Sequence, residues 1–250
     1  MKRIAQILTI ACLFASGTAM ANDGTPWVEK AFDHMRGETS ISEIVMTIQR
    51  PEFTRTMAMK SWTKGKRDAL FFITSPAKDA GNGTLKKGRS MWTFNPKVNR
   101  TIKLPPSMMS QAWLGSDFSN NDLSKTDSLV EDYVHSITET RTQDGFIVYE
   151  ISSIPTEDAA VVWGKLELSI REDGVLLRQA FFDEEGEPVK EMTTSQIEMM
   201  GGRSFPRVWL MKKEGETERF TTLTYKALSF DKPLKNNLFT LSSLKTKRTR

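Results

Sequence analysis

The sequence predicts a mainly β (α+β) protein built on one large, curved antiparallel sheet. From residue 40 onward, apolar and polar residues alternate over short segments, and turns rich in glycine, asparagine and aspartate separate these segments. About a dozen strands result, which is more than a flat sheet accommodates without strong curvature. We therefore expect a strongly coiled sheet with helices on its concave side, and a two-sheet sandwich is the alternative.

One amphipathic helix is predicted before the strands. Apolar side chains recur at helical spacing over residues 26–36, with Thr25 as the expected cap and Gly37 as the stop. The period then changes to two. The predicted strands begin at Ser40 and continue as 54–63, 69–74, 90–94, 101–104, 131–142, 146–154, 165–172, 176–183, 188–198, 205–213 and 219–228.

The segment 105–118 interrupts this pattern, because alternation does not explain its apolar residues. It follows a Pro-Pro break and contains Met108, Met109, Trp113 and Phe118. Methionine fills irregular space and tolerates varied neighbours. We predict a short, interrupted helix here that covers an apolar site as a lid.

The N-terminus predicts the compartment. Two basic residues precede an apolar run over 4–14, and the small-residue site Ala19-Met20-Ala21 follows. This is the pattern of a cleavable signal peptide over residues 1–21, and the run is shorter than the ~20 residues of a membrane-spanning helix. We expect a protein of the bacterial periplasm.

Cleavage would leave residues 22–250 as one domain without a cysteine. The chain's single cysteine, Cys12, lies in the predicted signal peptide, so neither disulfides nor thiol chemistry are expected and a hydrophobic core must hold the fold together. No linker or composition shift marks a domain boundary. An uncleaved N-terminal anchor and a lipoprotein modified at Cys12 are the less favoured alternatives.

The charge balance does not indicate a nucleic-acid binder. The formal net charge is +4, and two of these charges leave with the signal peptide, so about +2 remains (4 − 2). The excess lies mostly in the tail 245–250 rather than on a basic face that carries aromatic residues. We therefore expect no nucleic-acid partner.

Enzymatic chemistry has little support in the sequence. The two histidines, His34 and His135, do not stand in a metal-binding spacing, and there is no Gly-x-Ser-x-Gly nucleophile elbow. We predict no catalytic residue, no metal and no cofactor.

An acidic stretch in the middle of the chain has a structural interpretation. Asp117, Asp122 and Asp127 superficially suggest a calcium loop, but the glycine and the bidentate glutamate of such a loop are missing. Helix capping over 119–122 explains these residues better.

Several phrases together resemble a known family. They are GRSMWTFNP at 88–96, LGSDF at 114–118 and FPRVW at 205–209, set within a helix followed by meandering strands. This combination resembles a divergent branch of the LolA-like proteins, the outer-membrane lipoprotein-sorting group. The resemblance implies a LolA/LolB-like unclosed β-barrel covered by helices, with residues 22–250 as a single lipid-binding domain.

The resemblance also implies an apolar cavity that holds acyl chains. The composition is compatible with one, because the chain has 13 Met and 6 Trp and several of them share a face of their predicted strands. The candidate lipid-binding residues of cavity and lid are Met46, Met57, Met59, Phe72, Trp92, Phe94, Met108, Met109, Trp113, Leu114, Phe118, Trp209 and Met211.

Two functions follow as hypotheses. The first is a monomeric periplasmic carrier that binds acyl chains of a lipid or lipoprotein and delivers them towards the outer membrane, with an inner-membrane transporter as a further expected partner. The alternative is a non-transporting accessory subunit of a membrane exporter or envelope complex, whose core is filled by its own side chains. An enzyme that acts on envelope lipids is the least supported.

Overall fold

The computed structural model describes residues 23–235 and 237–245, so the predicted signal peptide and most of the basic tail lie outside the described residues. Within these residues no helix has the length and apolar character needed to cross a membrane. The helices are α1 (Thr25–Arg36), α2 (Asn120–Ser124), α3 (Ser128–Glu131) and α4 (Leu241–Lys245). The strands are β1 (Thr39–Arg50), β2 (Phe53–Lys64), β3 (Asp68–Ser75), β4 (Gly83–Lys87), β5 (Ser90–Asn95), β6 (Arg100–Lys103), β7 (Tyr133–Gln143), β8 (Phe146–Pro155), β9 (Lys165–Arg171), β10 (Leu176–Phe182), β11 (Pro188–Met200), β12 (Arg203–Lys213) and β13 (Phe220–Phe230).

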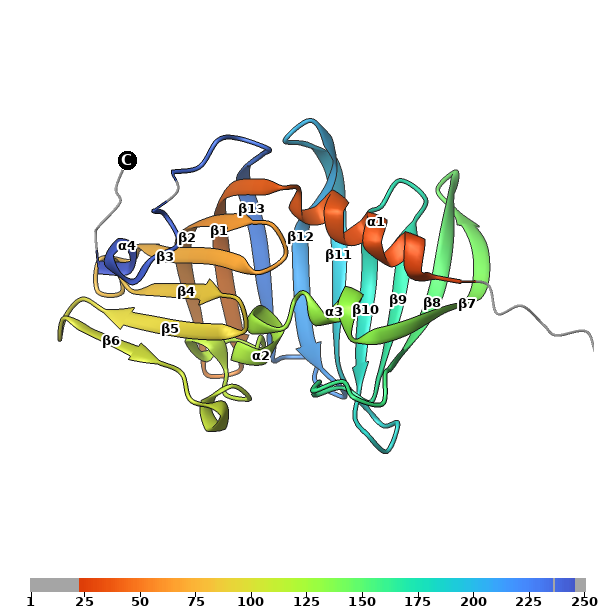
Figure 1. Ribbon diagram of the computed structural model, residues 1–250, viewed down its shortest axis with the longest axis horizontal. Coiled ribbons are helices and arrows are strands. Elements are labelled where there is room, and N and C mark those ends of the chain that lie inside the picture. The colour runs from red at the N-terminus through yellow and green to blue at the C-terminus, as the bar shows by residue number, and fades with distance from the viewer. Residues whose placement is uncertain (1–22, 236, 246–250) are drawn as a thin grey trace, which may run out of the picture.

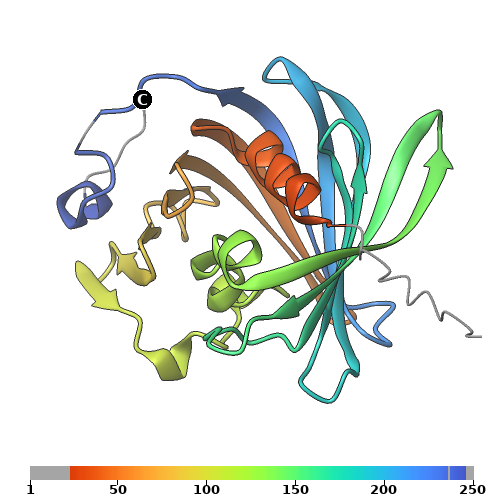
Figure 2. The ribbon, with the colours of Figure 1, turned by 45° about the vertical axis from the view of Figure 1, so that its right-hand side comes forward.

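All thirteen strands form one antiparallel sheet in the order β6-β5-β4-β3-β2-β1-β13-β12-β11-β10-β9-β8-β7. The order describes two meanders that meet where β1 pairs with β13. The sheet curves strongly and its edges, β6 and β7, do not pair, so the barrel stays open (Figure 1, Figure 2). This confirms the predicted mainly β, unclosed barrel, and the two-sheet sandwich is wrong.

Strand β4 was not predicted, because a turn pattern overlaps its start in the sequence. Gly83 looks like part of a Gly-Asn-Gly turn, yet it begins β4. A side chain there would come within 2.8 Å of both the Leu244 and the Phe72 side chains, so the site requires a residue without a Cβ. The glycine allows a close approach of neighbours rather than a turn.

The short, interrupted helix predicted over 105–118 is 3₁₀ rather than α-helical. This stretch forms two 3₁₀ turns, Pro106–Met108 and Trp113–Gly115, and Leu114 has a φ of 55°. The cause is local, because two prolines open the stretch and the left-handed residue at 114 ends any helical run. The α-helices α2 and α3 begin only after it, and the helix capping predicted over 119–122 is confirmed at α2, where Ser119 and Asp122 form a capping box.

Residues 104–132, which we call the inner segment, connect the two edges of the sheet. Because β6 and β7 stand at opposite edges, the chain between them must cross the open side. Figure 2 shows its helices α2 and α3 inside the curve of the sheet. Trp113 is buried there, and its indole Nε1 donates to Thr84 Oγ1 at 3.1 Å.

Ion pairs fix the inner segment to the sheet. Lys86 of β4 lies 2.8 Å from Asp127, and these side chains are only 1% and 0% exposed. Lys190 of β11 pairs with Asp122, and their side chains are 5% and 8% exposed. All five carboxylates of the segment have a basic partner from the sheet or its turns: Asp117 with Arg50, Asp122 with Lys190, Asp127 with Lys86 and Arg67, Glu131 with Arg67, and Asp132 with Arg89.

Helix α1 lies across the concave face over the second meander (Figure 1). It starts at Thr25, one residue earlier than predicted, with Gly24 rather than Thr25 as its cap, and the predicted stop at Gly37 is confirmed. The Trp27 ring stacks on Tyr149 with centroids 4.0 Å apart. Aromatic stacking of this kind adds to the burial of the helix and fixes it on the sheet.

A second apolar cluster lies on the outer face of the first meander. Trp62, Phe72 and Leu85 of the sheet pack there against Leu238 and Leu244 of the C-terminal segment that carries α4. Figure 2 shows α4 outside the curve of the sheet. Strands β2 to β5 are therefore covered on both faces.

The buried pair of Lys86 and Asp127 yields the first prediction. Replacing Lys86 with alanine leaves a buried carboxylate with a single, exposed partner in Arg67, so unfolding should become easier by about 3–5 kcal/mol. Urea denaturation monitored by circular dichroism measures this.

The matched control is Lys87→Ala, an exposed neighbour on the same strand, which should change stability by less than about 0.5 kcal/mol. The double variant Lys86→Met with Asp127→Leu should recover most of the loss, and equal effects of the two single lysine variants would contradict the assignment.

His135 yields the second prediction. Its side chain is buried on β7, with Nδ1 2.7 Å from Ser153 Oγ, and burial lowers its pKa. The unfolded chain, with an ordinary pKa of about 6.5, therefore binds a proton at a higher pH than the folded protein. The free energy of unfolding should be insensitive to this histidine above about pH 6.5 and should fall as the pH drops below that value. Denaturation of wild type and His135→Gln from pH 7.5 to 5 tests this, and identical pH slopes would contradict it.

Candidate functional site

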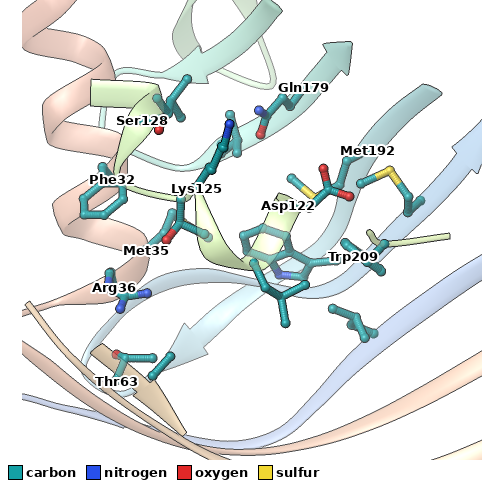
Figure 3. A pocket seen from close by; sticks show the side chains of 18 of the residues that line it. Phe32, Met35, Arg36, Thr63, Asp122, Lys125, Ser128, Gln179, Met192 and Trp209 are labelled. Carbon is teal, nitrogen blue, oxygen red and sulfur yellow. The ribbon is translucent and has the colours of Figure 1, made fainter. Parts of the chain in front are cut away.

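A cavity of about 340 Å³ lies within the concave face of the sheet. It is bounded by α1, the inner segment, residues 161–163 and the inward-facing side chains of β1 to β3 and β9 to β13. Figure 3 shows Phe32, Met35 and Arg36 of α1 on one side of the cavity and Met192 and Trp209 of the sheet on the other. The volume falls within the range of about 300–1,000 Å³ that is typical of small-molecule sites.

Most of the lining is apolar because strand alternation directs apolar side chains inward. Leu166, Leu168 and Ile170 of β9 are two residues apart and all line the cavity, as do Trp209 and Met211 of β12. Phe181 of β10 adds an aromatic ring whose centroid is 5.3 Å from that of Trp163. Such a surface binds hydrocarbon and offers few hydrogen bonds.

Hydroxyl groups at one end of the cavity satisfy one another. Ser42 and Ser61 lie 2.6 Å apart, and Ser40 and Thr63 lie 2.7 Å apart, in each case oxygen to oxygen across β1 and β2. Because each pair forms a hydrogen bond, these four side chains impose little desolvation cost on an apolar ligand. This part of the wall is polar in composition, but its hydroxyl groups already form hydrogen bonds with one another.

Three charged residues belong to the lining: Arg36, Asp122 and Lys125. Asp122 is neutralised by Lys190. Lys125 donates through Nζ to the Ala160 carbonyl, and burial, followed by the nearby charge of Arg89, lowers its pKa. Burial also lowers the pKa of Arg36 to about 10, which leaves its guanidinium charged at neutral pH.

Five of the thirteen predicted lipid-binding residues line the cavity. They are Met59, Trp113, Phe118, Trp209 and Met211. They come from β2, the inner segment and β12, so elements distant in sequence converge at one site.

Five others lie in the same hydrophobic core but outside the cavity lining: Met46, Met57, Met108, Met109 and Leu114. Met46 and Met57 are paired across β1 and β2 and are fully buried. Their periodicity correctly gives the inner face of the strands, but it does not distinguish packed core from cavity wall.

The remaining three, Phe72, Trp92 and Phe94, pack in the outer cluster beneath the C-terminal segment. The sequence places two adjacent aromatic residues on β3, and the one that faces the cavity is Phe71 rather than Phe72. Because the C-terminal segment covers the outer face, that face is apolar as well. The sequence of these strands therefore lacks the difference between apolar inward and polar outward residues from which the inner face is predicted.

Sequence reasoning missed several lining residues. Phe32 and Met35 carried a usable signal, because they share the apolar face of the predicted helix. No periodic signal could have found Val161, Val162 and Trp163, because they lie between β8 and β9 in a stretch without helix or strand. Across the residues that the structure describes, no group of three or more histidine, cysteine, aspartate or glutamate side chains could hold a metal ion.

Comparison with known proteins identifies the fold. A protein-family model described as "Uncharacterized protein" matches residues 65–246. No curated protein matches the chain. The chain is similar to the crystal structure of a DUF1329 family protein from Desulfovibrio piger, with 22% identity and a TM-score of 0.79 over 88% of this chain and 97% of the other.

Two further crystal structures are similar. One is a protein domain from Vibrio parahaemolyticus named for outer membrane lipoprotein sorting, with 20% identity and a TM-score of 0.75 over 89% of this chain and 98% of the other. The other is a LolA superfamily protein from Nitrosomonas europaea, with 21% identity and a TM-score of 0.73 over 89% of this chain and 100% of the other. Since the family model spans most of the chain, the chain belongs to the family which that model describes, and it shares a LolA-like fold with these crystal structures.

Proposed function

We propose that this protein is a periplasmic carrier that holds acyl chains of a lipid or lipoprotein in its apolar cavity and delivers them towards the outer membrane. The observation that carries the proposal is the cavity of about 340 Å³ on the concave face, with its largely apolar wall. The shared fold with a LolA superfamily protein and with a lipoprotein-sorting domain supports it. Residues 22–250 would act as one monomeric domain without catalysis.

Burial of hydrocarbon supplies sufficient free energy for such a carrier. Each methylene group transferred from water stabilises the complex by about 0.8 kcal/mol, so half a dozen buried methylenes contribute on the order of 5 kcal/mol before the costs of association. The alternative, an accessory subunit whose core is filled by its own side chains, fits less well because the concave face retains this cavity.

Entry and release of the ligand require part of the wall to move. The inner segment is anchored to the sheet by ion pairs at all five of its carboxylates. By contrast, residues 156–164 have neither helix nor strand, and Val162 is 38% exposed although it lines the cavity. We therefore assign the opening to this loop, because in the described part of the chain it has neither strand pairing nor an ion pair to the sheet, and a segment held by fewer interactions opens at a lower cost.

A charge placed in the wall should weaken binding. Leu223 on β13 lines the cavity, and Leu223→Asp should weaken binding of the uncharged fluorophore N-phenyl-1-naphthylamine about tenfold or more, because the carboxylate would be desolvated beside the ligand. Thr222→Asp introduces the same charge on the opposite face of the same strand and serves as the control. It should bind like wild type. Fluorescence titration of delipidated protein measures both.

A wild-type protein that binds no acyl ligand and that copurifies without lipid from the periplasm would overturn the carrier. Extraction and mass spectrometry of the purified protein provide this second, independent measurement. That result would favour the accessory subunit.

The proposed compartment has its own test. We expect the protein expressed in a Gram-negative bacterium to be released by osmotic shock, with a mass that corresponds to a chain beginning at or near Asn22. Intact-mass spectrometry measures this directly. A species that retains residues 1–21, or one acylated at Cys12, would contradict the prediction.

A further inference from the structure

Arg36 is an unusual residue in the wall of the cavity. It is the last residue of α1, and its side chain lies beside Phe32, Met35 and Thr63 (Figure 3). Among the arginines that the structure describes, only Arg36 and Arg100 have no carboxylate partner, and Arg100 is exposed on the edge strand β6. A cation in an apolar cavity without a counterion is costly unless something supplies the negative charge.

The hydrogen bonds of Arg36 leave part of its guanidinium available. Nε donates to the Gly65 carbonyl, and Nη2 donates to the Asp68 carbonyl at 2.9 Å. These bonds hold the plane of the group against the β2–β3 turn. Among the described residues, no group accepts a hydrogen bond from Nη1. A guanidinium carries five N–H donors in a planar fork that suits carboxylate and phosphate, so Nη1 can donate to a ligand of this kind.

Tyr225 of β13 contributes a second donor to the cavity wall, within electrostatic reach of Arg36. It lines the cavity, and its ring contacts Phe205 with centroids 4.9 Å apart. Burial raises its pKa to about 12, and the charge of Arg36 acts on it in the opposite sense, so the two groups interact electrostatically. The phenol is therefore a protonated donor, and no protein group in the described part of the chain accepts a hydrogen bond from it.

The surrounding charges leave this end of the cavity positive. The carboxylates of Asp127 and Asp68 act on Arg36 from beyond ion-pair distance. Asp127 is already neutralised by Lys86 and Arg67. The adjacent β2–β3 turn adds Lys64 and Lys66, both exposed.

We propose that Arg36 and Tyr225 form an oxyanion site at one end of the cavity, which takes the head group of an acyl lipid that carries a single carboxylate or phosphate. This inference rests on the proposed acyl-binding function and narrows its ligand class. The acyl chain would lie along the apolar wall, and the anionic end would receive N–H groups from Arg36 and the hydroxyl of Tyr225. A ligand with an uncharged ester end would gain no such contact.

The test compares ligands matched in chain and different in charge. Oleic acid is paired with methyl oleate, and oleoyl lysophosphatidic acid is paired with mono-oleoylglycerol, each titrated against bound N-phenyl-1-naphthylamine. Wild type should bind at least one anionic ligand about tenfold or more tightly than its neutral partner, since hydrogen bonds to a charged group are the strong ones. Preference in the first pair identifies a carboxylate and preference in the second a phosphate, and both support the site.

Variants attribute the preference to these residues. Arg36→Gln should remove most of the preference for the anionic ligand over its neutral partner and should weaken neutral binding far less, whereas Arg36→Lys should retain more of the preference. Tyr225→Phe removes only the hydroxyl and should weaken anionic binding several-fold. Arg100→Gln removes the other arginine without a carboxylate partner and should change nothing. Thermal melting confirms that each variant is folded, and Tyr225→Phe and Arg36→Lys keep the test valid if Arg36→Gln does not fold.

Two negative results are distinguishable. Equal, measurable affinity of wild type for both members of each pair overturns the oxyanion site but leaves the carrier in place. Absence of binding for all four ligands overturns the carrier itself, and the oxyanion site with it.

Discussion

The fold depends on the attachment of the inner segment to the sheet. An open barrel leaves its apolar concave face exposed, and the chain that links edge β6 to edge β7 must cross that opening. Its five carboxylates reach bases on β1, β4 and β11 and on two turns of the sheet, and Lys86 with Asp127 is almost fully buried. Breaking such a buried pair is costly because the remaining charge has no counterion, so the pairs specify where the segment lies. Apolar contact alone would not select one position.

The cavity follows from this arrangement. Ion pairs hold the inner segment at a defined place, and α1 packs on the sheet, where Trp27 stacks on Tyr149 of β8. The side chains between them line about 340 Å³ that they do not fill. Within this wall Asp122 is neutralised by Lys190, whereas Arg36 is bonded only to backbone carbonyls. The difference between these two residues separates a structural charge from one available to a ligand.

The two faces of the sheet pack against different parts of the chain. The inner face of β9 to β13 lines the cavity, whereas β2 to β5 are also covered on the outside by the C-terminal segment. The outer layer also explains the glycine at position 83, because Phe72 and Leu244 occupy the space that a Cβ would need. A sheet covered on both faces loses the apolar–polar alternation that reveals which side is inward. This explains why Phe72, Trp92 and Phe94 belong to the outer cluster.

The sequence by itself determined the class of the fold, the N-terminal helix, nearly all strands and the inward face of β2 and β12, where Met59, Trp209 and Met211 line the cavity. Periodicity and turn residues are local signals, and they sufficed for these features. Only the tertiary structure decided that Phe71 rather than Phe72 faces the cavity, and that Arg36 has no counterion. The spacing of Asp117, Asp122 and Asp127 gave no indication of their partners, because Arg50, Lys190 and Lys86 lie between 41 and 68 residues away in the chain. Long-range charge pairing leaves no periodic trace in a sequence, so it becomes visible only when the sheet brings those residues together.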